Sequence, residues 1–194
     1  MERGGLHAAL VRAGLTQAQV IGWADEIQVG LLGQVRRRWG RCGVRLHQRI
    51  QRRRQYRSLF VAAEIRSGRV WYCWLDNMKG EEFCGVVRGI EQAGVLDAVV
   101  WDGAPGHTDY RVSRIGVPLI PLPPYSPQLN PAERLFEAIR AELEGEVYAD
   151  LDAKCARVEA ILADWDAQPE RVRSLVGWHW ILHALEQLPA PTTS

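Results

Sequence analysis

Asp102 stands where an α/β protein often carries out chemistry. It directly follows the apolar run 95–101 and precedes the turn-forming sequence Gly-Ala-Pro-Gly. A carboxylate at the end of a buried strand lies where α/β sheets usually bind ligands. The alternative is an aspartate that ends the strand and caps the turn behind it. The local sequence alone leaves both readings open.

Glu133 has two readings as well. In the sequence Asn130-Pro-Ala-Glu133, a capping box explains the glutamate, with its carboxylate bonding back to the start of the helix. The chain approaching this helix, residues 121–131, contains five prolines. Prolines fix the backbone path but donate no hydrogen bond to a sheet. Their number here suggests that this segment sets the position of the helix start. This favours a chemical role for Glu133, and Glu137, one turn later, is the replacement if Glu133 is only a cap.

Asp25 is the third candidate, at the start of the first expected strand and beside Glu26. Taken alone it could be an exposed acid before a strand, and Asp76 is another acid at a strand end. Clustered carboxylates repel one another unless a cation neutralises them, and hard oxygen ligands favour Mg²⁺ or Mn²⁺. Two such ions, about 4 Å apart, would activate a water or a 3′-hydroxyl and stabilise the leaving oxygen of a phosphodiester. The trio Asp25, Asp102 and Glu133 therefore suggests metal-dependent chemistry on phosphodiesters.

A block of arginines supplies the second chemical signal. The window from residue 36 to residue 57 holds ten arginines and no acidic residue, and because the whole chain carries +1, the rest carries −9. Arginine's planar fork suits bidentate phosphate contacts, so the block predicts a polyanion, double-stranded DNA, as partner. A solvated basic hairpin is the alternative. The candidate DNA contacts are Arg36, Arg37, Arg38, Arg41, Arg45, Arg49, Arg52, Arg53, Arg54 and Arg57.

The elements that must position these residues follow from hydrophobic periodicity. Strands are expected from about residue 23 through 32, over 59–65 and 70–75, and, as buried apolar runs, over 95–101 and 117–122. Helices are expected over 80–92, from Pro131 with Asn130 as its cap, and near 150–166 and 170–188. Residues 6–22 give no clear pattern. The order predicts an α/β fold with a central mixed sheet flanked by helices.

Composition excludes several classes of protein. Hydrophobic residues make up 47% and charged residues 24%, as in an ordinary soluble domain. No apolar run approaches the roughly 20 residues of a membrane helix, and no signal sequence is visible, so we expect a cytoplasmic protein without a membrane partner. The four cysteines are scattered without a CxxC pair, which argues against disulfides or a zinc ribbon.

Three stretches resemble, in order, the catalytic motifs of mariner-like transposases, and more narrowly the bacterial insertion-sequence branch of the DDE endonuclease superfamily. The first runs from Asp25 through Arg38-Trp-Gly-Arg-Cys-Gly43. The second is Trp101-Asp-Gly-Ala-Pro-Gly-His107, and the third is Leu122-Pro-Pro-Tyr-Ser-Pro-Gln-Leu-Asn-Pro-Ala-Glu-Arg-Leu-Phe136. The proline-rich third motif is the most specific, and the first is weak by itself.

The resemblance implies a ribonuclease-H-like fold with two divalent metal ions that nicks DNA at transposon ends and joins them to a target. Asp25, Asp102 and Glu133 match the three metal-binding acids, and His107 and Asn130 match positions beside them. We expect residues 1–22 to be a short segment without a recognition domain, 23–145 the catalytic core, 146–188 a helical extension and 189–194 a polar tail. Thirty residues separate Asp102 from Glu133, a few fewer than the family commonly shows.

Other functions stay open beside catalysis. A truncated, inactive DNA-binding remnant could regulate a full-length transposase, and a host nuclease of ribonuclease-H type could act on RNA–DNA hybrids. A second copy of this chain and a partner chain that carries a helix-turn-helix are open as protein partners. His179 and His183, at i and i+4, could bind zinc, but the apolar residues around them favour a packed helix.

Overall fold

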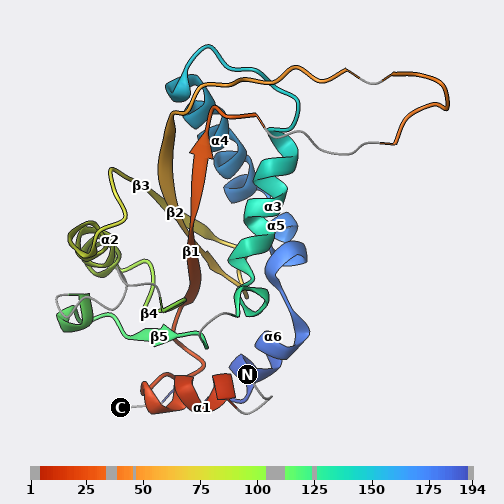
Figure 1. Cartoon of the computed structure of the whole chain (residues 1–194). Helices are drawn as coiled ribbons and strands as arrows, with labels where there is room; N and C mark the ends of the chain where they lie inside the picture. The colour runs from red at the N-terminus through yellow and green to blue at the C-terminus, as the bar shows by residue number, and fades with distance from the viewer. Residues whose placement is uncertain (1–4, 34–38, 46, 104–111, 124–125, 192–194) are drawn as a thin grey trace.

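A five-stranded sheet with helices on both faces forms the molecule (Figure 1). The structure is a computed structural model that describes residues 5–33, 39–45, 47–103, 112–123 and 126–191. Its elements are α1 (Gly5–Arg12), β1 (Ile21–Gly30), β2 (Tyr56–Glu64), β3 (Val70–Leu75), α2 (Gly80–Ala93), β4 (Ala98–Trp101), the 3₁₀ helix η1 (Val112–Arg114), β5 (Leu119–Pro121), the 3₁₀ helix η2 (Pro127–Leu129), α3 (Ala132–Glu142), α4 (Leu151–Ala167), α5 (Pro169–Val176) and α6 (His179–Glu186).

The sheet is mixed, as the sequence predicts. Its strand order is β3-β2-β1-β4-β5, with β1 at the centre. β1 pairs antiparallel with β2, and β2 with β3, whereas β4 and β5 run parallel to β1. The four residues of β4 are all buried, which explains their continuous apolar pattern, since a central parallel strand is covered on both faces.

Two apolar cores lie on opposite faces of the sheet. Side chains alternate along β1, so Trp23, Ile27 and Val29 belong to the core beneath α3 and α4, whereas Ala24 belongs to the core beneath α2. Asp25 shares the parity of Trp23 and Ile27 and therefore faces the α3 side. The helices of the C-terminal extension contribute to this larger core, which ties the extension firmly to the sheet.

The helices differ from the sequence expectations in two places. Residues 6–22 gave no clear pattern, yet α1 forms there and buries Leu6 and Leu10 in the larger core. The single helix expected over 170–188 is wrong, because the backbone at Gly177 (φ −72°, ψ 58°) ends α5 before α6 begins. Every helix in the described residues is too short or too polar to span a lipid bilayer.

A long arm connects β1 to β2, and we define it as residues 31–55. Its base is closed by two backbone hydrogen bonds, from Leu31 N to Gln55 O (2.9 Å) and from Gly33 N to Gln51 O (2.8 Å). In Figure 1 the described part of the arm extends well away from the sheet. Gly43 lies at a turn with a positive φ of 80°, and the described residues of the arm form no strand.

Candidate active site

Two of the three candidate acids lie side by side on neighbouring strands. β1 and β4 pair in parallel, with Trp23 opposite Val100. Continued two residues beyond the last pair, this register brings Asp25 level with Asp102, just past the end of β4, and the negative charge of Asp102 raises the pKa of Asp25. Asp102 is exposed just after the end of β4, and Asp25 is half-buried in the middle of β1. The sheet therefore fixes the spacing of these two carboxylates through its backbone.

Asn130 fastens the start of α3 to β1. Its side-chain Nδ2 donates to Ala24 O at 2.9 Å and to Asp25 Oδ2 at 3.2 Å, while its Oδ1 accepts from Ala132 N at 3.2 Å. The side chain is almost completely buried, with 1% exposed. One carboxamide thus forms hydrogen bonds with both the first turn of α3 and the central strand β1. It places the helix start directly over the first acid.

Glu133 lies in the first turn of α3, the helix that Asn130 joins to β1. The N-cap position of α3 is Pro131, one residue after the predicted cap Asn130, whose Oδ1 accepts from Ala132 N; the Glu133 carboxylate accepts no hydrogen bond among the described residues. The capping-box reading is therefore not what the structure shows. Glu137, the alternative acid, is exposed and pairs with Arg134 at 2.8 Å, so Glu133 is the better candidate.

The electrostatics of Asp25 reflect its neighbours. Burial is the largest cause that raises the pKa of Asp25, and the negative charges of Glu26, Asp102 and Glu133 raise it further. A hydrogen bond from the Glu26 backbone N–H opposes them, and the resulting pKa is about 7, against an ordinary value of 3.8. The three candidate acids are thus close enough to interact, and they interact unfavourably when all are ionised.

Burial of the charge, together with this repulsion, predicts that Asp25→Asn stabilises the metal-free protein. The raised folded-state pKa means that the folded protein favours the protonated acid, so stability falls as pH rises from about 4 to about 7 and the penalty is complete above that window. Asparagine removes the charge and keeps an acceptor for Asn130. At pH 8 in EDTA we expect a gain of about 2 kcal/mol, or about 6 °C in the thermal midpoint.

Thermal unfolding at pH 4 and pH 8 checks this expectation. The gain should be small at pH 4, close to the ordinary pKa of 3.8, because the folded acid is protonated there and little of the penalty has developed. A variant less stable than the wild type at pH 8 would show that the ionised Asp25 carboxylate does not destabilise the folded protein.

The donor set fits hard divalent cations. Three carboxylates from β1, the end of β4 and α3 face one region, and oxygen ligands of this kind bind Mg²⁺ or Mn²⁺. Within the described residues, no group of three His, Cys, Asp or Glu side chains is drawn close enough to hold a single ion.

The structure places the predicted DNA-contacting arginines unevenly. Arg41, Arg45, Arg49, Arg52, Arg53 and Arg54 are exposed on the arm. Two arginines near its base have structural partners: Arg53 donates to Ala149 O at 3.0 Å, and Arg57 pairs with Asp152 at 3.2 Å. Arg36, Arg37, Arg38 and His107 lie outside the described residues.

The sequence underrated one residue. It placed Asn130 only beside the three candidate acids, whereas the structure joins Asn130 directly to Asp25. The available signal was a carboxamide immediately before a helix that begins with Pro-Ala-Glu. Its second contact, with Ala24 O, involves a strand more than 100 residues earlier and leaves no mark on the local pattern.

The sequence and the fold have counterparts among known proteins. Residues 20–153 match the DDE superfamily endonucleases, and the chain belongs to that superfamily. The paired-end complex of Mos1 transposase with its left transposon end is similar in fold (TM-score 0.63, 14% identity, covering 96% of this chain and 61% of that one). So is the catalytic domain of Mos1 mariner transposase (TM-score 0.59, 16% identity, covering 95% of this chain and 87% of that one).

These similarities establish a ribonuclease-H-like α/β fold, because at such identities they concern the fold alone. A pre-cleavage Mos1 transpososome gives a TM-score of 0.67 at 16% identity, over 95% of this chain and 58% of that one. The chain spans about three-fifths of the length of the Mos1 chains in these DNA complexes. No curated protein sequence matches it.

Proposed function

We propose that this chain is the catalytic domain of a mariner-like DNA transposase of the bacterial insertion-sequence kind, which cleaves phosphodiester bonds at transposon ends and joins those ends to target DNA. The observation that carries the proposal is the register of β1 and β4, which places Asp25 beside Asp102, together with Asn130, which fastens the helix of Glu133 to the same strand. Membership of the DDE superfamily endonucleases supports the reaction class.

Asp25, Asp102 and Glu133 are the residues that would hold the metal. When bound, two divalent ions, Mg²⁺ or Mn²⁺, would activate the attacking water or 3′-hydroxyl and stabilise the leaving oxygen. The protein's own contribution is placement. The sheet sets two carboxylates at a fixed spacing, and Asn130 orients the Asp25 carboxylate while it aims the first turn of α3.

The arm is the proposed DNA-binding element. Its exposed arginines would contact backbone phosphates, so binding would depend strongly on salt and carry little sequence information. A second copy of this chain and a chain with a helix-turn-helix are further proposed partners, and the sequence specificity for the transposon end would come from the latter. His107 is proposed to lie beside the metal-binding acids.

Cleavage of labelled DNA tests the proposal. The purified chain is offered duplexes that carry the inverted repeats flanking its own gene, with Mg²⁺, Mn²⁺ or EDTA. We expect strand cleavage with either metal and none with EDTA. An RNA–DNA hybrid is offered in parallel, and preferential cleavage of the hybrid would assign the chain to the ribonuclease-H type instead.

The alternative of an inactive DNA-binding remnant gives a distinct result. It predicts salt-sensitive binding of the same duplexes without cleavage under any metal condition. That outcome would remove the catalytic proposal and leave the DNA-binding one.

A further inference from the structure

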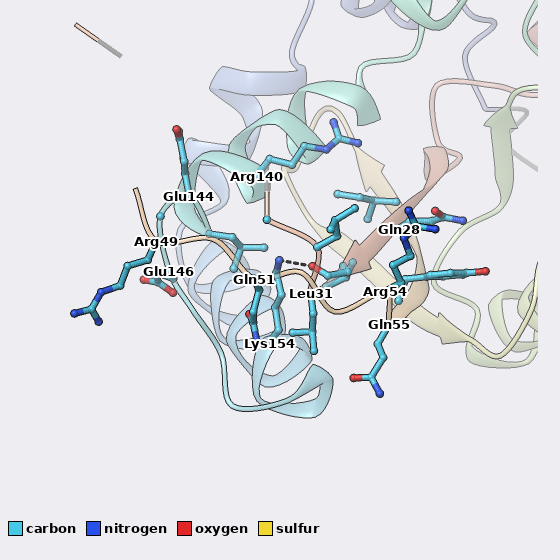
Figure 2. Close-up of a pocket in the computed structure, with 18 of the residues that line it drawn as sticks. Gln28, Leu31, Arg49, Gln51, Arg54, Gln55, Arg140, Glu144, Glu146 and Lys154 are labelled. Carbon is cyan, nitrogen blue, oxygen red and sulfur yellow. Dashed lines mark hydrogen bonds between the residues drawn. The ribbon is translucent and has the colours of Figure 1, made fainter. Parts of the chain in front are cut away.

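A pocket of about 430 Å³ opens at the base of the arm, and none of the three acids lines it (Figure 2). It lies between the end of β1, the returning part of the arm, the C-terminal end of α3 and the first turns of α4. Its floor is apolar, with Ile27, Val29, Leu31 and Leu143 among the lining residues. No part of the proposed catalytic mechanism uses it.

The pocket is rich in cations. Arg49, Arg54, Arg140 and Lys154 line it against two acids, Glu144 and Glu146. Figure 2 shows Lys154 reaching into the middle of the pocket, where its Nζ donates to Gly30 O at 2.6 Å, whereas Arg49 points outward. Burial lowers the pKa of Lys154, as expected for an ammonium group with little solvent around it.

Arg140 is the most informative of these cations. Its side chain is half-buried, and its guanidinium lies over the Phe136 ring, 6.0 Å from the centroid. No carboxylate among the described residues pairs with Arg140. Charged groups that lose solvent are ordinarily paired, so a half-buried guanidinium beside a pocket is suited to an anion that enters from outside.

Helix α3 carries both Arg140, which lines the pocket, and Glu133, one of the three acids. Arg140 follows Glu133 by seven residues, so both project from the same face of α3, about 10.5 Å apart along the helix axis. Phosphates on one strand of duplex DNA advance by about 3.4 Å each along the duplex axis. For a duplex that runs parallel to α3, this distance corresponds to about three phosphates. Glu137, on the same helix between them, is already paired with Arg134.

We propose that this pocket binds a backbone phosphate of DNA through Arg140, about three phosphates from the one that lies at the three acids. The phosphate contact stands on the pocket itself, whereas the spacing rests on the proposed function. Arg140 would then fix how far the strand extends past the acids. Lys154 adds positive charge to the pocket and stays bonded to the end of β1.

The salt dependence of DNA binding tests the phosphate contact. Binding of a fluorescein-labelled duplex of about 24 base pairs is measured by anisotropy in EDTA over 50–200 mM KCl, conditions without cleavage. We expect Arg140→Gln to reduce the magnitude of the slope of log K against log[KCl] by about 0.9, the value of one phosphate contact, and Arg140→Lys to retain the slope.

Arg88→Gln is the matched control, because Arg88 is an exposed arginine on α2, across the sheet from α3. It makes the same change of charge and should leave the slope unchanged. Thermal unfolding confirms that each variant is folded. An unchanged slope in Arg140→Gln, an equal loss in Arg88→Gln, or no binding by the wild type would overturn the proposal. Because no cleavage is involved, these results are independent of the catalytic proposal.

The spacing is tested separately on a DNA that the chain cleaves. Single methylphosphonates, which remove one backbone charge, are placed one to five phosphates from the cut bond. We expect the wild type to lose affinity at about the third position on one side, and Arg140→Gln to be insensitive there. A sensitive position adjacent to the cut bond, or none at all, would contradict the spacing.

Discussion

Asp102→Asn is expected to reduce DNA cleavage by about 10³-fold or more while it leaves folding and DNA binding intact. A loss of this size corresponds to about 4 kcal/mol of transition-state stabilisation, which is reasonable for removing a ligand of a catalytic metal ion. Asp102 is exposed at the end of β4, so asparagine fits its place without repacking any core. Initial rates on labelled DNA with Mg²⁺, compared with binding measured in EDTA, give the two quantities.

Two glutamates on α3 provide the matched comparison. Glu133→Gln should lose cleavage as severely as Asp102→Asn, because it removes the third carboxylate. Glu137→Gln changes the same chemical group one turn later, where the acid is exposed and paired with Arg134, and should retain activity within about threefold. The reverse order of effects would move the third ligand to Glu137.

The second large effect is expected at Asn130. Asn130→Ala deletes a buried carboxamide that makes three hydrogen bonds, and it leaves Ala24 O without this donor in the interior. We expect a loss of about 2–3 kcal/mol in the free energy of unfolding, since each orphaned buried group costs about 1–3 kcal/mol. Cleavage should fall by about 10²-fold in the protein that remains folded, because the carboxylate of Asp25 and the start of α3 lose their common anchor.

The chain's other asparagine isolates the contacts with β1. Asn77 accepts a hydrogen bond from the N–H two residues later, Lys79 N at 2.9 Å, as Asn130 does from Ala132 N, but it lies on an exposed loop. Asn77→Ala should therefore cost less than about 1 kcal/mol and leave the rate of cleavage unchanged. Chemical denaturation and initial rates measure both variants. Equal losses at the two positions would show that the contacts of Asn130 with β1 add nothing to stability or cleavage.

Asn130→Asp distinguishes position from charge. Aspartate keeps an acceptor for Ala132 N but replaces the donor to Ala24 O and Asp25 with a fourth negative charge. At pH 8 in EDTA we expect it to be less stable than Asn130→Ala, because the new charge is buried beside an acid whose pKa is already raised. A variant as stable as the wild type would show that the site tolerates a fourth charge without a cation.

The sequence predicted the sheet well because its strands carry distinct patterns. The run 95–101 is apolar except for Asp97, and the part after this aspartate, Ala98–Trp101, forms the fully buried β4. The alternating or apolar runs at 59–65 and 70–75 became β2 and β3. Among the helices, the break at Gly177 was missed, because a single glycine within a periodic pattern does not by itself end a helix.

The candidate site was predictable only in part, because its geometry is non-local. The three acids could be selected from strand ends, a proline-guided helix start and a family resemblance. Their proximity depends on the pairing of β1 with β4, residues some 77 positions apart in the chain, which no local pattern encodes. The pocket around Arg140 was not predicted, since it joins the end of β1, the base of the arm, α3 and α4, four segments that are distant in sequence.

The closure of the arm at its base has a consequence for how such chains diversify. The arm leaves the sheet and returns to it at paired backbone positions, Leu31 with Gln55 and Gly33 with Gln51. Lengthening a loop between two fixed points costs little, about 0.6 kcal/mol for each doubling. The arm is thus a module that insertion, deletion or exchange can alter while the acids keep their register. Under the proposed function, the DNA contacts of the arm can therefore change while the strand register that carries Asp25 is kept.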